Sequence, residues 1–493
     1  MSGRFPERIS TGTEGLDDIL QGGLVPNRSY LVRGDPGTGK TILGLNFLTA
    51  KREDETALYV NLEETEEDIR TNAASVGIDI GDVEFLDLSP ESQVFSQDQS
   101  YDIFAPDEVE QDPLTTKITD RVEALSPDRV FIDPLTKLRY LTADEYQFRK
   151  QVISFMQYLR ERGATVLFTS QNTSESSDED LQFLSDGMIE LARDSSGRTI
   201  SVPKFRGSGT QSGTHSLSIG DDGIRVYPEI QPEKHDSEFV SEPLSSGVPQ
   251  IDDLLGGGLE RGTITIISGP TGVGKTTTGS QFVKEAAGRG ERSVMYMFEE
   301  TKPTFLERSE AVNIPVEEML GQEVLSVQEV EPLNHSAEEF AQMVKSEVEE
   351  NDTDIVMLDG IDGYKLALRG EEDNLVRKLH LLGRYLKNMG VTVILVDETA
   401  GVTGEFRATD SGISYLADNI VVLRHMEVQG ELRKAIGVLK KRTSDFERTL
   451  REFEITEHGL TAGEPLTELQ GVLSGTPKWV GETDAEQKFI DEE

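Results

Sequence analysis

The chain has 493 residues, a length that predicts two to four domains at roughly 100–200 residues each. Its 48 Lys and Arg against 91 Asp and Glu give a formal net charge of −43, and 36% of its residues are hydrophobic, enough to form globular cores. The lack of Cys excludes disulfide frameworks, thiolate zinc sites and iron–sulfur clusters. No apolar run approaches the ~18 residues of a membrane helix, and the N-terminus has no signal-peptide core, so we expect a soluble, cytoplasmic protein.

The acidic residues are spread along the whole chain rather than gathered in one tail. One interpretation is a surface that binds cations or repels acidic substrates. We favour a second, adaptation to molar salt, where the Debye length is ~3 Å and self-repulsion is screened. The charge then indicates a halophilic source, which we expect to be an archaeon. It also disfavours unassisted nucleic-acid binding, which depends on cationic patches.

The sequence is a tandem repeat. GTEGLDDILQGGL at 12–24 returns as GVPQIDDLLGGGL at 247–259, and further landmarks recur in the same order. Chance does not produce such an ordered set, so we predict two homologous domains, 1–228 and 240–465. The polar stretch 229–239 suits a linker, and 466–493 is expected to be a C-terminal tail.

In each repeat, short apolar runs alternate with helix-like stretches. In chain order the predicted strands are SYLVRG, TALYVNL, RVFID, TVLFTS and MIELA, and then TITIISG, SVMYMF, DIVMLD, VTVILVD and NIVVL. Runs of this kind suit strands buried on both faces. The segments 145–163 and 373–390 have helical periodicity and end in Gly, a helix-stop signal. The alternation predicts an α/β fold in each repeat, a mainly parallel sheet flanked by helices.

A Gly-rich loop follows the first strand of each repeat, GDPGTGKT and GPTGVGKT, and both fit the phosphate-binding pattern G-x-x-x-x-G-K-[ST]. The glycines let backbone N–H groups surround phosphate oxygens, and the following helix adds its N-terminal dipole. Lys40 and Lys275 would reach the β- and γ-phosphates. The nucleotide-binding residues predicted on this basis are Gly34, Asp35, Pro36, Gly37, Thr38, Gly39, Lys40 and Thr41, and Gly269, Pro270, Thr271, Gly272, Val273, Gly274, Lys275 and Thr276. They indicate ATP as the ligand.

The next strand of each repeat leads to a pair of carboxylates, Glu63-Glu64 and Glu299-Glu300. A Glu at the tip of a parallel strand beside the γ-phosphate is a candidate general base for in-line attack. Neighbouring side chains on an extended strand point in opposite directions, so one of each pair is expected to face the phosphate. The alternative is a pair of solvated surface acids.

Asp133 and Asp359 each close a further apolar strand. A carboxylate there, together with the hydroxyls of Thr41 and Thr276, is the usual Mg²⁺ side of a P-loop site, so we predict Mg²⁺ as cofactor. Gln171 follows the next strand, where a γ-phosphate sensor would lie. The second repeat has Asp397 or Glu398 in that region, which leaves the sensing role open.

This ordered set resembles the KaiC branch of the RecA-like P-loop ATPases in its double-domain form. The match covers essentially 9–463 and depends on TGTEGLDDILQGGL, the two phosphate loops, both EET segments and the FRGSGT and KKRTS motifs. The resemblance implies two tandem RecA-like domains, homo-hexameric rings with ATP between neighbouring subunits, and slow ATP hydrolysis. It also implies autophosphorylation of a Ser/Thr pair in the second domain.

Further site residues are carried over through the resemblance. Lys204 and Arg206, with Lys440 and Arg442, match the basic residues that contact nucleotide on the adjacent subunit; the alternative is an exposed K-x-R on an edge strand. Ser414 matches the first phosphoacceptor, or is simply a polar loop residue. The family's second acceptor is Thr and here it is Tyr415, whose hydroxyl lies farther from the backbone. That change argues against an ordered two-site cycle and a clock function.

The leading interpretation is therefore an ATP-hydrolysing ring that acts as a regulatory switch and phosphorylates itself on serine. Two alternatives stay open: a RecA-like DNA recombination or repair ATPase, since fold does not fix function, and a nucleotide-gated scaffold with negligible turnover. No appended DNA-binding module or basic stripe favours the former. The sequence indicates no membrane contact and does not identify protein partners.

Overall fold

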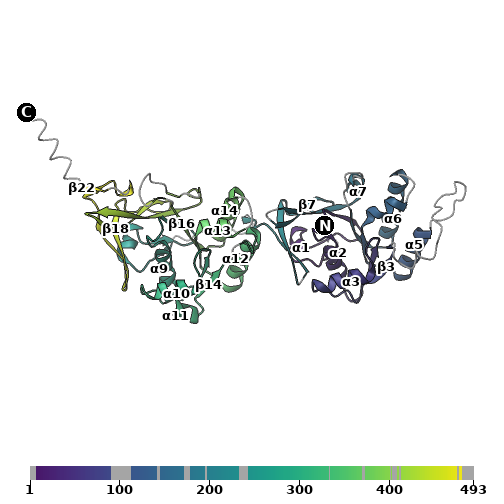
Figure 1. Ribbon diagram of the computed structural model, residues 1–493, viewed down its shortest axis with the longest axis horizontal. Helices are drawn as coiled ribbons and strands as arrows, with labels where there is room; N and C mark the ends of the chain where they lie inside the picture. Colours follow the sequence, from purple (N-terminus) through teal and green to yellow (C-terminus); the bar gives the residue numbers. More distant parts are fainter. Residues whose placement is uncertain are drawn as a thin grey trace, which may run out of the picture. The chain divides into compact units, whose positions relative to one another are not determined.

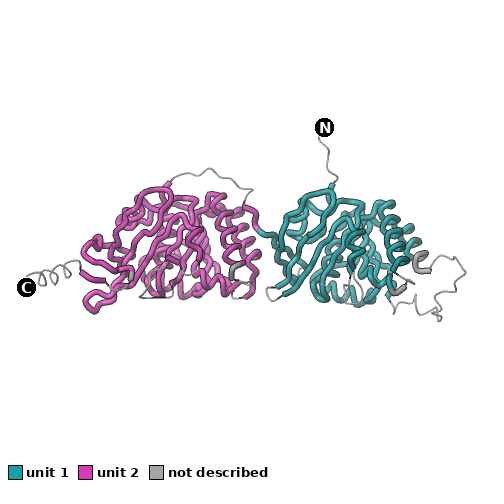
Figure 2. Tube along the Cα trace, turned by 90° about the horizontal axis from the view of Figure 1, so that it is seen from above, with its two compact units in different colours: residues 1–229 teal, residues 230–493 magenta. Residues whose placement is uncertain are grey.

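The computed structural model describes residues 7–89, 113–141, 145–170, 178–194, 197–221, 223–232, 242–331, 333–368, 372–399, 401, 408–409, 412–474 and 477–479. The chain divides into two compact units, 1–229 and 230–493 (Figure 2). The two units have the same sheet topology.

Unit 1 has a nine-stranded sheet in the order β3-β2-β4-β5-β1-β6-β7-β8-β9. Figure 1 marks its strands β3 and β7 among the helices of the unit. The six strands from β3 to β6 are mutually parallel, and β7, β8 and β9 extend the sheet as antiparallel hairpins. The strands are β1 Ser29–Gly34, β2 Ala57–Asn61, β3 Glu84–Asp87, β4 Arg129–Asp133, β5 Thr165–Thr169, β6 Gly187–Asp194, β7 Gly197–Phe205, β8 Thr214–Gly220 and β9 Gly223–Tyr227. The helices are α1 Leu16–Ile19, α2 Lys40–Thr49, α3 Glu66–Ser75, α5 Pro113–Leu125, η1 Leu135–Leu141, α6 Glu145–Glu161 and α7 Glu179–Leu184.

Unit 2 repeats this arrangement in a second nine-stranded sheet, β14-β13-β15-β16-β12-β17-β18-β19-β20. Its strands are β12 Ile264–Gly269, β13 Ser293–Met297, β14 Leu325–Glu329, β15 Ile355–Asp359, β16 Thr392–Glu398, β17 Asn419–Val428, β18 Glu431–Lys441, β19 Arg451–Thr456 and β20 Gly459–Pro465. Its helices are α8 Pro249–Leu254, α9 Lys275–Gly288, α10 Lys302–Glu310, α11 Val316–Gly321, α12 Ala337–Asn351, α13 Ile361–Ala367 and α14 Glu372–Asn388. A short ribbon, β10 Pro243–Leu244 with β11 Leu259–Glu260, precedes the sheet.

Each sheet is covered on both faces, which is why its central strands are apolar throughout. In β4 the side chains of Val130 and Ile132 join the core under α5, α6 and α7, whereas Phe131 joins the core under α2 and α3. The same alternation in β15 sends Val356 and Leu358 to one core and Met357 to the other. This confirms the expected α/β architecture of two mostly parallel sheets flanked by helices.

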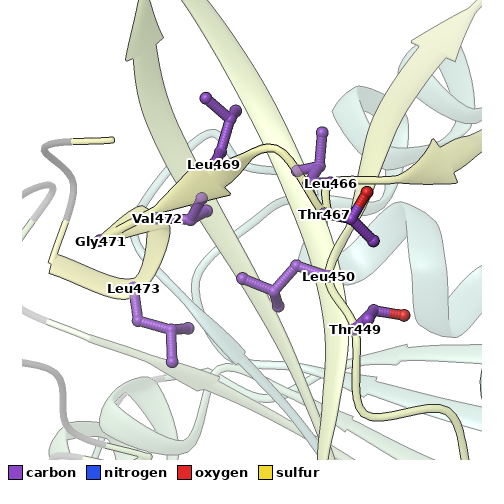
Figure 3. Close-up of a pocket in the computed structure, with 8 residues that line it drawn as sticks. All are labelled: Thr449, Leu450, Leu466, Thr467, Leu469, Gly471, Val472 and Leu473. Carbon is purple, nitrogen blue, oxygen red and sulfur yellow. The ribbon is translucent and has the colours of Figure 1, made fainter. Parts of the chain in front are cut away.

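Part of the predicted tail packs on unit 2. β21 Leu469–Gln470 pairs with β22 Lys478–Trp479, and the intervening turn η3 Val472–Ser474 lies near the end of β17. Val472 is buried with Met426, Val428 and Ala435. Figure 3 shows the adjoining hollow, of about 670 Å³, lined by Thr449, Leu450, Leu466, Thr467, Leu469, Gly471, Val472 and Leu473. None of these residues is charged, so the hollow does not have the chemistry of a phosphate site.

Candidate functional site

The two phosphate loops connect a central strand to a helix, β1 to α2 and β12 to α9. Gly37 and Gly39 adopt positive φ values of 77° and 106°, and Gly272 and Gly274 adopt 70° and 111°. Only glycine takes these conformations without strain, and they permit the backbone turn that directs N–H groups toward an anion. Both loops therefore have the backbone expected of a phosphate cradle.

The loop lysines are held by carbonyl groups of the loop itself. Lys40 donates from Nζ to the carbonyls of Gly34, at 2.7 Å, and Asp35, at 3.0 Å. Lys275 donates to the carbonyl of Pro270 at 3.0 Å and lies 3.4 Å from Oε2 of Glu398. Burial lowers the pKa of Lys40, and the charges of Asp133, Asp35 and Glu63 oppose that shift. Each ammonium thus lies at the start of its loop, where it can exchange carbonyl oxygens for phosphate oxygens.

The close approach of helix to strand brings Thr and Asp together in each unit. A Cβ on Gly44 of α2 would lie 2.1 Å from the ring of Phe131, and one on Gly279 of α9 would lie 2.6 Å from Cε of Met357. Glycine therefore lets each helix pack closely onto the strand that ends in Asp133 or Asp359. As a result Thr41 Oγ1 donates to Asp133 Oδ2 at 2.6 Å.

The equivalent contact in unit 2 joins Thr276 Oγ1 to Asp359 Oδ1 at 2.9 Å. Hydroxyl and carboxylate oxygens are the ligands that Mg²⁺ prefers, and the ion normally takes further oxygens from phosphate and water. Both pairs fit the predicted metal position. In the described part of the chain, no group of three or more His, Cys, Asp or Glu residues forms a metal site made of side chains alone.

The surroundings of the two aspartates differ. Asp133 also accepts hydrogen bonds from Tyr59, at 3.2 Å, and from Thr169. The strand register places Met295 and Val396 at the corresponding positions of unit 2, and neither side chain can donate. Burial raises the pKa of Asp359 to about 6, although the Thr276 hydroxyl and the charge of Arg308 lower it.

The glutamate pairs lie just beyond β2 and β13, not within them. The chain bends at 62–64 and at 298–300, so the alternation expected of an extended strand does not apply there. In unit 1, Glu63 forms an ion pair with Lys137 at 3.2 Å, and Glu64 accepts a hydrogen bond from Asn72 at 3.3 Å. Burial, reinforced by the charge of Asp133, raises the pKa of Glu64.

The partners are different in unit 2. Glu299 Oε1 accepts the backbone N–H of Gly363 at 3.0 Å. Glu300 is held by both arms of Arg308, with Nη2 to Oε2 at 2.7 Å and Nε to Oε1 at 3.2 Å. Each of the four glutamates therefore has a distinct partner. The charge of Asp133 acts on Glu64, and the charges of Glu299 and Glu300 act on Asp359.

The basic residues at the ends of β7 and β18 divide into two kinds. Lys204 donates to the carbonyls of Gln182 and Ser185, both at 2.6 Å, and Lys440 donates to the carbonyl of Ser414 at 3.1 Å. These lysines cap local turns of their own units. The side chains of Arg206 and Arg442 are exposed.

Arg206 lines a hollow of about 590 Å³ in unit 1, together with Arg28, Arg160 and Asp186 among others. Arg28 Nη1 donates to the carbonyl of Arg206 at 2.6 Å, which fixes the backbone at the end of β7. The carboxylates of Glu161 and Asp186 line the same hollow, so it brings together three guanidinium groups and two carboxylates.

The predicted acceptor Ser414 lies in a turn that begins just after Ile413. Its neighbour Tyr415 is about half exposed and stacks on His380 of α14, with ring centroids 5.6 Å apart. Arg442 Nη2 lies 3.4 Å from the carbonyl of Tyr415. Gln171 lies outside the described residues; the register of β5 and β16 identifies Glu398 as its counterpart.

Sequence reasoning missed several residues of the site, among them Tyr59, Asn72, Lys137, Thr169 and Arg308. A position-by-position comparison of the two repeats was the available signal, because the phosphate loops, the glutamate pairs and the strand-end aspartates align the repeats locally, at offsets of 235, 236 and 226 residues. The residue eight positions after Glu64 is the neutral Asn72. The residue eight positions after Glu300 is the positively charged Arg308.

Comparison with known proteins agrees with this duplicated geometry. The profile of the KaiC ATPase family matches residues 9–231 and 244–466. The chain belongs to the KaiC family. Similar relatives include the circadian clock oscillator protein KaiC of Synechococcus elongatus, 29% identical over 487 residues that cover 95% of this chain and 92% of that protein. The protein of the same name from Prochlorococcus marinus strain SARG is 29% identical and covers 97% of both chains. The family is one of ATPases. Among the described residues no helix is both long and apolar enough to span a bilayer.

Proposed function

We propose that both units bind MgATP and hydrolyse it slowly, and that the chain acts as a nucleotide-driven regulatory switch. The observation that supports this most directly is the repeated contact of a loop threonine with a strand-end aspartate, Thr41 with Asp133 and Thr276 with Asp359. A duplicated site of this form is expected where both copies bind nucleotide.

The residues have separable roles in this proposal. The phosphate-loop backbones and Lys40 or Lys275 would hold the phosphates, and the Thr–Asp pairs would hold Mg²⁺. When bound, Mg²⁺ supplies positive charge beside the phosphoryl oxygens. One glutamate of each pair would accept the proton of the attacking water.

We also propose a homo-oligomeric ring, with a hexamer as the expected form. Arg206 and Arg442 would then reach the nucleotide of a neighbouring subunit. The relatives are named circadian clock proteins, but Tyr415 stands where the family has a second threonine acceptor. The switch is therefore proposed without an ordered two-site phosphorylation cycle.

Nucleotide binding is tested with Lys40→Ala and Lys275→Ala in the full chain at molar KCl. Each variant should lose about half of the bound ATP, since an ammonium at the β/γ-phosphates contributes to only one site. Bound ATP would be counted by equilibrium dialysis, with Lys284→Ala, a lysine of α9 away from the loop, as the control. Full stoichiometry in either variant would contradict the assignment of that site. Turnover that rises strongly with single-stranded DNA would instead favour the recombinase alternative.

Serine autokinase activity in unit 2 is the narrower part of the proposal. Ser414 should be phosphorylated in wild-type protein incubated with MgATP, and the phosphate should disappear in the Glu299→Gln/Glu300→Gln variant, because a serine hydroxyl needs its proton removed as the bond forms. Tyr415, longer and stacked on His380, should stay unmodified. Mass spectrometry of the peptide 408–424 tests whether Ser414 carries a phosphate. An unmodified peptide in protein that steadily hydrolyses ATP would show that the protein is an ATPase without this kinase activity.

A further inference from the structure

The positively charged partner of the glutamate pair changes between the two units. In unit 1 it is Lys137, and it pairs with the first glutamate, Glu63. In unit 2 it is Arg308, and it pairs with the second, Glu300.

The exchange follows from two substitutions at equivalent positions. Lys137 lies four residues after Asp133, and the residue four after Asp359 is Gly363, which offers only its backbone N–H to Glu299. Arg308 lies eight residues after Glu300, and the residue eight after Glu64 is Asn72, which offers a neutral amide. Each unit therefore has one glutamate held by a cation and one held by a neutral donor, in opposite order.

Packing keeps these arrangements in place. Arg308 donates from Nη1 to Thr277 Oγ1 at 3.1 Å, next to Thr276 of the phosphate loop, and its guanidinium lies 5.6 Å from the ring centroid of buried Phe305. A Cβ on Gly363 would come within 2.7 Å of Cγ of Glu299, so no side chain fits there without displacing that glutamate. Unit 2 thus has no room for the lysine that unit 1 uses.

A cation reduces the ability of a carboxylate to accept a proton. Both oxygens of Glu300 already accept N–H groups of Arg308, so this carboxylate would have to give up a charge-assisted hydrogen bond before it could take a proton from water. A carboxylate whose partner is a neutral amide or backbone N–H keeps more of its basicity. By their hydrogen-bond partners, the better placed proton acceptors are Glu64 in unit 1 and Glu299 in unit 2.

We propose that Lys137 and Arg308 are positioning residues that give the two glutamate pairs opposite roles, with Glu64 the proton acceptor in unit 1 and Glu299 in unit 2. The water oxygen bonds to the γ-phosphorus as the bond to the ADP oxygen breaks, and the water proton passes to that glutamate. Glu63 and Glu300 keep their ion pairs with Lys137 and Arg308. This inference rests on the proposed function, because it requires ATP hydrolysis at each unit.

The test uses full-length protein with one site silenced: Lys275→Ala isolates unit 1 and Lys40→Ala isolates unit 2. In these backgrounds, Glu64→Gln and Glu299→Gln should lower kcat by ~100-fold or more, in the range of a lost general base, with little change in KM. Glu63→Gln and Glu300→Gln should lower kcat by less than ~10-fold. Greater loss at the first glutamate of both pairs would overturn the proposal.

A reciprocal exchange separates positioning from a structural role. In unit 1, Asn72→Arg with Lys137→Gly installs the partners found in unit 2, and the damaging substitution should then move from Glu64→Gln to Glu63→Gln. Lys137→Arg and Arg308→Lys, which keep the cation, should retain kcat within ~3-fold of the parent, a smaller change than the loss of a base. Bound-ATP stoichiometry and far-UV circular dichroism check that each variant folds.

If the exchanged variant folds and Glu64 remains essential, Lys137 and Arg308 do not assign the roles. If the exchanged variant does not fold, the four Glu→Gln measurements alone decide. If neither silenced background hydrolyses ATP while both still bind it, the proposed function fails and this inference fails with it. If both units hydrolyse ATP and turnover depends on the first glutamate of both pairs, or on the second of both, this inference is wrong but the proposed function stands.

Discussion

Glu260 and Lys441 form an almost fully buried ion pair in unit 2, at positions where the first repeat has Val25 and Phe205. Lys441 Nζ lies 2.8 Å from Glu260 Oε1, and the side chains are only 1% and 6% exposed. Burial by itself would raise the pKa of Glu260, but hydrogen bonds from Lys441, Thr443 and Ser444 bring it below its usual value. The stability that this carboxylate contributes is therefore present above its unfolded pKa and is lost as the pH falls through its folded pKa.

Breaking this pair should cost more than replacing it. Glu260→Gln leaves the Lys441 ammonium buried without its counter-ion, so the free energy of unfolding at pH 7 should fall by ~3–5 kcal/mol. The double variant Glu260→Val/Lys441→Phe imports the residues of the first repeat and should be neutral or more stable by ~1–4 kcal/mol. Urea titrations at molar salt would measure both.

The exposed pair of Glu431 and Arg433 supplies the control for that measurement, since Glu431→Gln should change stability by less than ~1 kcal/mol. The penalty of Glu260→Gln should also shrink as the pH is lowered, because the wild-type carboxylate then becomes protonated. A double variant as unstable as Glu260→Gln would show that the ion pair contributes more than an apolar replacement can.

Among the elements, those with an unbroken apolar run could be predicted and those with one solvated face could not. All ten predicted strands are present. The strands β1, β2, β4 and β5 are buried along most of their length, whereas burial alternates in β6, which was found from its short apolar run MIELA. The helices α6 and α14 end just before Gly163 and Gly390, at φ values of 85° and 82°, as the helix-stop signal predicted. The edge strand β3 and the antiparallel strands β7 to β9 were missed because their burial alternates or is partial.

The site shows the same division between what the sequence specifies and what only the fold supplies. The phosphate loops, the glutamate pairs and the strand-end aspartates are contiguous motifs with known spacing, so their sequence positions suffice. Tyr59, Thr169 and Arg308 reach the site from separate elements, and only the strand register and the packing of α10 reveal their contacts. The lysines Lys204 and Lys440 make local caps that the K-x-R spacing does not predict.

At the scale of the whole molecule, the net charge of −43 predicts that stability depends on salt. Between ~0.1 M and ~1 M salt the Debye length falls from ~10 Å to ~3 Å, so repulsion among the exposed carboxylates is largely screened. The midpoint of thermal unfolding should therefore rise steadily up to molar KCl. A response that saturates at millimolar MgCl₂ and ignores KCl would instead favour a cation-binding surface.

Assembly is the last property that belongs to the whole molecule, and the exposed arginines are the residues that test it. Arg206 lies in a hollow with Arg28 and Arg160, whereas the neighbouring Lys204 is already bonded to carbonyls of its own unit. A guanidinium delivered across an interface would stabilise charge on the transferring phosphoryl group and make turnover depend on the ring. We therefore expect Arg206→Ala to reduce hydrolysis at the unit 1 sites and Arg442→Ala to reduce it at the unit 2 sites. The midpoint of thermal unfolding should stay unchanged in both variants.

Mixing experiments then show whether the site is shared. Subunits with Arg206→Ala and subunits with Glu63→Gln/Glu64→Gln are each expected to be nearly inactive in unit 1, measured with the unit 2 site silenced by Lys275→Ala. In a hybrid ring, some interfaces combine an intact arginine from one subunit with intact glutamates from the next, so mixing should restore part of the turnover. The recovery should grow with subunit exchange and vanish when each parent ring is cross-linked beforehand. Well-mixed rings without any recovery would place each complete site within a single chain.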